Sequence, residues 1–189
     1  MSRRYYQEEN LNYIKQTINL PMEEHTLPFM EHVADNGGNR ILDVGCGSGR
    51  DLKTFTHNEF DCLGVEPDEF FAEYAELFSG AKVAHCDIRH FVSDKKFDGV
   101  WCSASLIHIP REELTGVLER LGNLMHKDSI FYASFKLGKD YSDGRRDFTC
   151  FDRDGIHQLF HESPLKVSIV YLSSGNGSSW INVLAKLRG

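Results

Sequence analysis

The chain has 189 residues, of which 41% are hydrophobic and 26% are charged, the composition of an ordinary globular protein rather than a disordered or fibrous one. Its formal net charge of -7 argues against nucleic acid as a partner, because binding a phosphate backbone usually needs a clustered basic surface. No stretch approaches the roughly 18 apolar residues of a membrane span, and charged residues interrupt residues 1–20. We therefore expect one cytoplasmic domain, residues 1–189, without a membrane segment.

Residues 3–36 have the pattern of two helices, the second with Leu27, Met30, Val33 and Ala34 on one side. From residue 37 onward, apolar runs alternate with helical patterns, which is typical of a parallel sheet covered by helices. The expected strands of this part are Arg40 to Val44, Asp61 to Glu66, Ala81 to Cys86, Phe97 to Cys102, and Ser129 to Phe135.

Local signals place helices between these strands. Pro67 is expected to open a helix that carries Leu77 and ends at Gly80, since proline costs nothing at a first helical position. Pro110 to Met125 has one apolar stripe that should pack flat on the sheet. Asp152 is expected to cap a further helix through its side chain.

The last two expected strands are Lys166 to Leu172 and Trp180 to Leu187, with only Ser173 to Ser179 between them. A parallel neighbour would need a crossover of about a dozen residues, so this pair must be antiparallel. The pattern predicts an α/β fold in three layers, with a mostly parallel sheet of seven strands that ends in an antiparallel hairpin.

A glycine-rich loop, Gly45 to Gly49, follows the first expected strand. Ligands of open parallel sheets bind where the strands end and their order reverses, and glycine lets the main chain approach a ligand closely. The dinucleotide fingerprint needs glycine or alanine at the place of Arg50, so a pyrophosphate is disfavoured. Asp43, just before the loop, would repel a pyrophosphate but attract an ammonium group.

The run Ile41 to Gly49 resembles the cofactor loop of class I S-adenosylmethionine-dependent methyltransferases, which have a Rossmann-like sheet of seven strands. The resemblance implies that Asp43 lies near the amino-acid end of S-adenosyl-L-methionine, Glu66 near its ribose, and Asp87 with the main chain of Ile88 at the adenine. Each carboxylate taken singly also fits a helix cap or a solvated turn. The full expected cofactor-binding set is Asp43, Gly45, Cys46, Gly47, Gly49, Glu66, Pro67, Asp87, Ile88, Ser103 and Tyr13.

The segment Trp101 to Leu114 is similar to a group of small bacterial methyltransferases related to the tellurite-resistance type, and the segments Phe131 to Lys136 and Gly144 to Thr149 strengthen the match. By this resemblance residues 1–36 form a lid over the cofactor and residues 37–189 form the cofactor-binding core. The substrates of that group vary, so the resemblance predicts the methyl donor, with S-adenosyl-L-homocysteine as a product, and leaves the acceptor open.

The place after the fourth strand holds Ser103, Ala104 and Ser105 instead of the Asp/Asn-Pro-Pro-Tyr loop of enzymes that methylate base amines, which argues against that chemistry. We therefore expect a small-molecule acceptor. The alternatives are a protein or RNA acceptor, a protein that binds the cofactor without transfer, or a nicotinamide-dependent oxidoreductase.

Two further features bear on the acceptor. His108 is a candidate general base, because its ordinary pKa lies near neutrality; the alternative is that it caps the helix at Pro110. The long segment Lys136 to Cys150 is expected to form a flap over the acceptor, or else a charge run balanced by its aspartates. The residues expected to bind substrate are Lys136, Arg145, Arg146 and Trp180.

The remaining cysteine and histidine residues predict no metal site. The five cysteines have no Cys-x-x-Cys spacing and are expected to be buried free thiols. His157 and His161 are four residues apart on an expected helix but have no apparent third ligand. We expect the protein to be a monomer or a homodimer.

Overall fold

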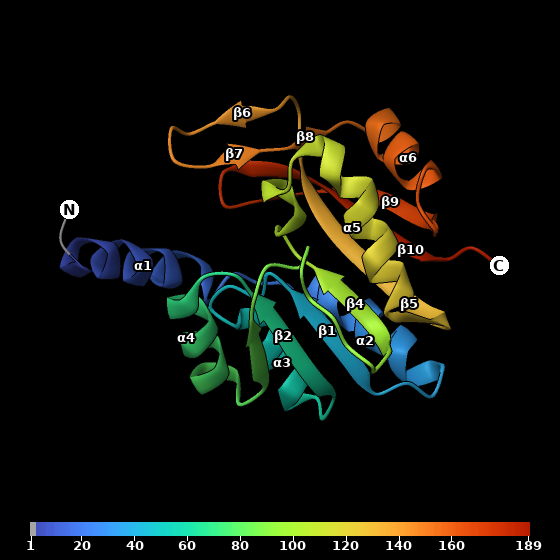
Figure 1. Cartoon of the computed structure of the whole chain (residues 1–189), viewed down its shortest axis with the longest axis horizontal. Coiled ribbons are helices and arrows are strands. Elements are labelled where there is room, and N and C mark those ends of the chain that lie inside the picture. The colour runs from blue at the N-terminus through green and yellow to red at the C-terminus, as the bar shows by residue number, and fades with distance from the viewer. Residues whose placement is uncertain (1–2) are drawn as a thin grey trace.

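The computed structural model describes residues 3–189, with side chains from residue 10 onward, so residues 1 and 2 of the predicted domain lie outside the described part. A central sheet runs through the molecule, with helices on both of its faces (Figure 1). Its long strands are β1 (Arg40–Val44), β2 (Asp61–Glu66), β3 (Lys82–His85), β4 (Phe97–Cys102), β5 (Met125–Leu137), β9 (Leu165–Gly175) and β10 (Ser178–Leu187).

These strands follow the order β3-β2-β1-β4-β5-β10-β9, in which only the pairs formed by β10 are antiparallel. The predicted mostly parallel sheet with an antiparallel C-terminal pair is therefore confirmed. One short strand, β8 (Cys150–Phe151), adds to this sheet by pairing with the end of β5. Two others, β6 (Tyr141–Ser142) and β7 (Asp147–Phe148), form a separate hairpin.

The side chains of the strands alternate between two apolar layers, as the pleat requires. On one face Ile41, Trp101 and Tyr132 pack against Phe29 and Phe55. On the other face the strands pack against the apolar stripe of α5 and against α6. The helices are α1 (Arg3–Thr17), α2 (Glu23–Asp35), α3 (Arg50–His57), α4 (Glu69–Ser79), α5 (Arg111–Asn123) and α6 (Arg153–His161), with a short 3-10 turn, η1 (Leu106–His108).

The buried faces of two helices differ from the sequence prediction. In α2 the predicted residues Met30 and Val33 are buried together with Phe29, whereas Leu27 is 50% exposed. In α4 Leu77 is 88% exposed, because the face toward α3 buries only small side chains. When apolar residues occur on two adjacent faces of a helix, their spacing alone does not show which of the two faces is buried.

Helix starts are shifted slightly from the prediction. The helix α4 begins at Glu69 instead of Pro67, and Asp68 caps it, since its carboxylate accepts the N–H of Phe71 at 3.1 Å. The predicted cap of α6 is confirmed, with Asp152 Oδ1 accepting the N–H of Gly155 at 2.8 Å. Within residues 3–189 no helix is long and apolar enough to cross a membrane.

Candidate functional site

The sheet reverses its order at β1, whose neighbours are β2 on one side and β4 on the other. The loop after β1 has three glycines with left-handed φ angles, and two of them are also close to a neighbouring segment. Gly45 has a φ of +65°, and a Cβ added there would lie 2.4 Å from Ser105 Cβ. Gly49 has a φ of +81°, and a Cβ there would lie 3.0 Å from Ala75 Cα in α4. Only glycine fits either position without strain.

Two adjoining cavities open at this edge of the sheet, and they share Tyr13, Gly45, Gly47 and His108 among their walls. The larger has a volume of about 620 Å³ and the smaller about 510 Å³, both in the range of small-molecule sites. The larger cavity also contains the predicted residues Asp43, Cys46 and Ser103, and the smaller contains Glu66, Pro67, Asp87 and Ile88. Gly49 lines neither cavity, so its evident role is the packing of α3 on α4.

Asp43 lies at the end of β1 with its side chain only 2% exposed. Among the described residues, no group hydrogen-bonds its Oδ2 atom. Burial raises the pKa of this carboxyl well above its ordinary value, and the neighbouring carboxylate of Asp51 raises it further. A buried acceptor without a partner is costly in a native protein, so this oxygen is available to a ligand.

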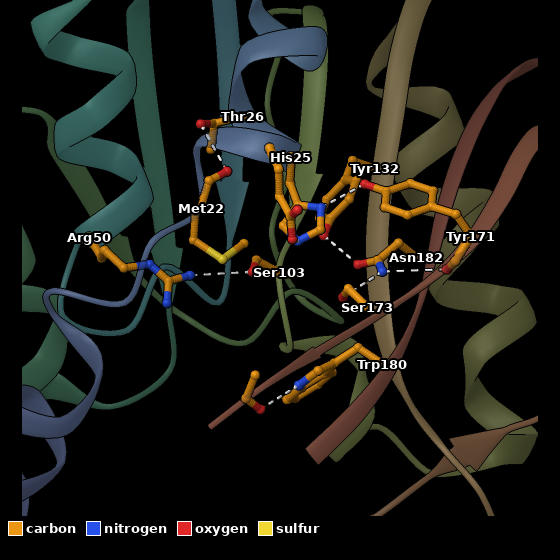
Figure 2. A network of polar contacts seen from close by, with 12 residues as sticks. Met22, His25, Thr26, Arg50, Ser103, Tyr132, Tyr171, Ser173, Trp180 and Asn182 are labelled. Carbon is orange, nitrogen blue, oxygen red and sulfur yellow. Dashed lines mark hydrogen bonds and ion pairs between the residues drawn. The ribbon is translucent and has the colours of Figure 1, made fainter. Parts of the chain in front are cut away.

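Arg50 was used in the sequence prediction only to argue against a dinucleotide, yet it lines the larger cavity. Its Nε and Nη2 atoms donate to the two oxygens of Asp51, at 2.6 and 2.8 Å, and Asp51 also accepts the indole N–H of Trp101 at 2.9 Å. The Nη2 atom points toward Ser103 at 3.4 Å (Figure 2). The position of Arg50 directly after the glycine loop could have indicated from sequence that its guanidinium lines the cavity.

Glu66 ends β2 with both carboxylate oxygens engaged by the main chain. Oε2 accepts the N–H of Gly47 at 2.9 Å, and Oε1 accepts the N–H of Asp68 at 3.0 Å. Burial raises the pKa of Glu66, and these two N–H groups oppose the shift. The carboxylate is thereby fixed at the wall of the smaller cavity.

Asp87 is held by a residue that the sequence prediction did not include. Arg89 donates to both oxygens of Asp87, through Nε at 2.9 Å and Nη2 at 2.7 Å, and its Nη1 donates to Glu113 at 2.8 Å. The hydrogen bonds from Arg89 lower the pKa of Asp87, which therefore stays ionised. Both residues line the smaller cavity together with Ile88.

His108, in η1, lines both cavities. Its ring nitrogen Nδ1 lies 3.2 Å from the main-chain oxygen of Asp147, and its ring packs on Phe148 with centroids 4.9 Å apart. Partial burial lowers the pKa of His108, as do the positive charges of Arg146 and Lys136. The side chain thus contacts the β6-β7 hairpin.

The segment predicted as a flap contains the β6-β7 hairpin and the flanking residues up to β8. Some of its charged side chains anchor it to the rest of the protein, and others line the cavities. Asp140 accepts from Arg111 at 2.7 Å and from the N–H of Cys150 at 2.8 Å, which anchors the flap to α5. Lys136 and Arg146 line the larger cavity, as does Trp180 of β10. Arg145 lines only the smaller cavity and Arg146 lines both, so the four predicted substrate residues do not all line the same cavity.

A polar network that sequence reasoning missed borders the larger cavity beside α2 (Figure 2). His25 Nδ1 lies 2.7 Å from the hydroxyl of Tyr171, and its ring lies near both Tyr132 and Tyr171. The hydroxyl of Tyr132 donates to Asn182 at 2.8 Å, and Asn182 donates to Ser173 at 2.9 Å. These residues come from segments far apart in the sequence, which is why no local pattern could reveal the network.

Residues 41–128 match the family described as a methyltransferase domain. This segment begins in β1, includes the glycine loop and reaches the start of β5, which is just under half of the chain. A search of curated proteins finds no match. The fold and the site therefore define a protein with a methyltransferase-type sheet and a ligand cavity at its switch point.

Solved structures extend the similarity over almost the whole chain. An S-adenosylmethionine-dependent methyltransferase from Clostridium acetobutylicum ATCC 824 superposes with a TM-score of 0.77 at 14% identity, covering 97% of this chain and 99% of its own. A 1,6-didemethyltoxoflavin-N1-methyltransferase from Burkholderia thailandensis, with bound S-adenosylhomocysteine, gives 0.78 at 17% identity, covering 97% and 84%. Magnesium protoporphyrin IX methyltransferase from Synechocystis PCC 6803, with bound SAM, gives 0.70 at 18% identity, covering 95% and 83%.

At these identities the similarity establishes the fold, which is the Rossmann-like methyltransferase fold that the sequence predicted. The matched methyltransferase domain agrees with the predicted kind of protein, an enzyme.

Proposed function

We propose that this protein is a methyltransferase that transfers the methyl group of S-adenosylmethionine to a small-molecule acceptor, with S-adenosylhomocysteine as the second product. The observation that carries the proposal is the buried, unpartnered Oδ2 of Asp43 beside the glycine loop. An ammonium group is the kind of ligand that such an oxygen needs, since it brings both a positive charge and hydrogen-bond donors.

The residues present fit the amino-acid end of this cofactor. Asp43 is proposed to accept from its ammonium group, and the Nη atoms of Arg50 to donate to its carboxylate. Near the glycine loop, the wall of the larger cavity includes the carboxylates of Asp43 and Asp51 and the guanidinium of Arg50. The cofactor carries the opposite pattern, with a positive ammonium, a positive sulfonium and one negative carboxylate.

The smaller cavity is proposed to hold the adenosine part. Glu66 is fixed by two main-chain N–H groups and keeps lone pairs for ribose hydroxyls. Asp87, held by Arg89, keeps an acceptor position on Oδ2 for the adenine amino group. Tyr13 of α1 packs edge-on against Phe71 of α4 at 5.5 Å and lines both cavities, which supports the proposal that α1 acts as a lid.

S-adenosylmethionine supplies a methyl group on a positively charged sulfur, which is a good leaving group. The transfer breaks the sulfur–carbon bond, whose electron pair stays on sulfur, and forms a bond from the methyl carbon to a nitrogen or oxygen of the acceptor. The proton of that acceptor atom is proposed to pass to Nε2 of His108. The cavity also accelerates the transfer by aligning the acceptor with the methyl group, because positioning alone can supply much of the rate enhancement of such a displacement.

A small acceptor is favoured by the volume of the larger cavity, about 620 Å³, and by the negative net charge of the chain. The acceptor half of the larger cavity lies between η1, β10 and the hairpin and is lined by side chains from all three. Two of the similar structures are enzymes named for 1,6-didemethyltoxoflavin and magnesium protoporphyrin IX. The resemblance to the tellurite-resistance-related group fits this proposal, while the cytoplasmic location and the monomer or homodimer state stay predictions.

Isothermal titration calorimetry with S-adenosylhomocysteine and, separately, with NADH tests the proposed function. We expect micromolar binding of S-adenosylhomocysteine and none of NADH. No heat of binding for S-adenosylhomocysteine at millimolar concentration would refute the proposal, and binding of NADH alone would favour the oxidoreductase alternative.

A further inference from the structure

The larger cavity has an acceptor end that differs sharply from its donor end near Asp43. We define this acceptor subsite by the residues His108, Lys136, Arg146, Phe148 and Trp180, all of which line the cavity. We propose that its occupant is a small aromatic or heteroaromatic molecule that carries a carboxylate or another oxyanion, held by Lys136 against flat aromatic walls. This inference rests on the proposed function and names the class of its substrate.

The ammonium group of Lys136 is the centre of the subsite. Its Nζ lies 4.3 Å from the centroid of Phe148, 5.0 Å from that of Tyr141 and 5.9 Å from that of Trp180, and it donates to the Tyr141 hydroxyl. Within the described part of the chain, no carboxylate lies within 4.0 Å of this nitrogen to form an ion pair. Lys136 is half-buried, and its ammonium has aromatic faces and a hydroxyl around it, so an anionic ligand would complete its environment.

A second positive charge lies on the same wall. The guanidinium carbon of Arg146 is 5.5 Å from the centroid of Phe148. Its ion pair with Asp143 is loose, with 3.9 Å between nitrogen and oxygen, and Asp143 is also occupied by the N–H groups of Arg145 and Arg146. The subsite therefore presents two cations around one aromatic ring, while the carboxylates of Asp43 and Asp51 lie at the other end of the cavity.

The walls of the subsite are flat and fixed. The rings of Tyr141 and Phe148 stack at 4.6 Å with an angle of 10° between their planes. The indole N–H of Trp180 donates to the main-chain oxygen of Gly175 at 3.2 Å, which orients the ring at the mouth of the β9-β10 hairpin (Figure 2). A planar ligand can lie against such rings by stacking, whereas a bulky aliphatic one loses that contact.

The charge pattern also orients the ligand. Its anionic group is drawn to Lys136 and Arg146, while its reacting nitrogen or oxygen faces Nε2 of His108 and the donor end of the cavity. Direct methylation of the carboxylate is disfavoured in this orientation, because the anionic group is held on the side away from Asp43.

Binding of matched probes to the protein saturated with S-adenosylhomocysteine tests the inference. The probes are salicylate, its neutral amide salicylamide, and cyclohexanecarboxylate, an anion without a flat ring, each titrated by ligand-observed NMR. We expect salicylate to bind about tenfold, or 1.4 kcal/mol, more tightly than either of the others. Salicylamide lacks the charge that Lys136 would pair with, and cyclohexanecarboxylate lacks the flat ring that would stack.

Three variants assign the effect to particular side chains. Lys136→Met keeps the length and removes the charge, and it should reduce the preference for salicylate over salicylamide to about twofold or less. Lys136→Arg keeps the charge and should retain most of that preference. Trp180→Leu should reduce the preference for salicylate over cyclohexanecarboxylate and leave the preference over the amide intact.

The inference is overturned if the native protein binds salicylamide as tightly as salicylate, if none of the probes binds at millimolar concentration, or if Lys136→Met keeps the full preference. Calorimetry with S-adenosylhomocysteine on the native protein and on each variant distinguishes failure of the acceptor class from failure of the proposed function. Native-like affinity for S-adenosylhomocysteine with no charge preference refutes the acceptor class alone, whereas absence of that binding in the native protein refutes the proposed function and the inference with it.

Discussion

The ring of His108 is oriented by the main chain of Asp147, with 3.2 Å between Nδ1 and the carbonyl oxygen. A carbonyl oxygen only accepts hydrogen bonds, so Nδ1 carries the proton. The lowered pKa of the imidazole keeps it neutral near pH 7, and Nε2 is then left with a lone pair. The flap that carries the acceptor subsite thus also fixes the tautomer that a general base requires.

His108→Ala is expected to lower kcat by about 10²–10⁴-fold, the usual contribution of a general base, with little change in affinity for S-adenosylhomocysteine. The rate of the native enzyme should fall as His108 becomes protonated. Because its pKa is lowered from 6.5, the midpoint of this acid limb should lie below pH 6.5. The matched control is His157→Ala, an exposed histidine of α6, which should keep native kinetics. A His108→Ala enzyme with native kcat would remove the residue from the mechanism.

Arg50 is expected to recognise the carboxylate of the cofactor, and a pair of ligands can isolate this contact. Methylthioadenosine shares the adenosine and sulfur of S-adenosylhomocysteine but has no amino-acid group. Arg50→Lys should weaken S-adenosylhomocysteine binding by about 10–100-fold, since a planar bidentate donor is replaced by a point charge. Affinity for methylthioadenosine should stay within about threefold. Equal losses for both ligands in calorimetry would mean that the variant distorts the site and that Arg50 does not bind the carboxylate.

Asp43 is expected to release its proton when the cofactor binds, because burial raises the pKa of the free carboxyl and the ligand's ammonium favours the ionised form. Calorimetry at one pH in two buffers with different ionisation enthalpies measures this release. Asp43→Asn should abolish it and weaken binding of S-adenosylhomocysteine by about 10–100-fold. Proton release that is equal in the native and Asp43→Asn proteins would contradict the assignment.

The same shift predicts how stability depends on pH. A carboxyl whose pKa is raised in the folded state contributes stability that is present below its ordinary value of 3.8 and is lost as the pH rises through the folded pKa. In the absence of ligand, the native protein should therefore lose stability relative to Asp43→Asn as the pH rises above 3.8, so the free energy of unfolding of the variant minus that of the native protein should increase. Urea unfolding of both proteins at several pH values checks this; a constant difference would mean that Asp43 titrates normally.

The strands and their order could be predicted because local signals agree with the global fold. The limits of β1, β2 and β4 coincide with those expected from sequence, since each is an apolar run bounded by turn residues. The short connection before Trp180 required the antiparallel pair. The exposed side of α4 could not be predicted, because the close approach of α3 that selects its small residues depends on the left-handed Gly49.

For the site, residues that end parallel strands could be found from the sequence, and their partners could not. Asp43, Glu66 and Asp87 reach the cavities because strand ends meet at one edge of the sheet. Arg89 holds Asp87 through local hydrogen bonds that give no apolar pattern. His25 of α2 is held at the cavity by Tyr171 of β9, which lies 146 positions away in the sequence.

Gly49 and Gly80 form a natural pair for separating backbone strain from steric contact. Both have left-handed φ angles, +81° and +76°, but a Cβ at Gly49 would lie 3.0 Å from Ala75 while one at Gly80 would meet nothing within 4 Å. Gly80→Ala should cost about 1–2 kcal/mol, the usual penalty for alanine in this conformation. Gly49→Ala should cost about 1–3 kcal/mol more, because backbone atoms of α4 must move. Urea unfolding measures both, and equal losses would show that α3 and α4 separate at little cost, against the tight packing found at the start of α3.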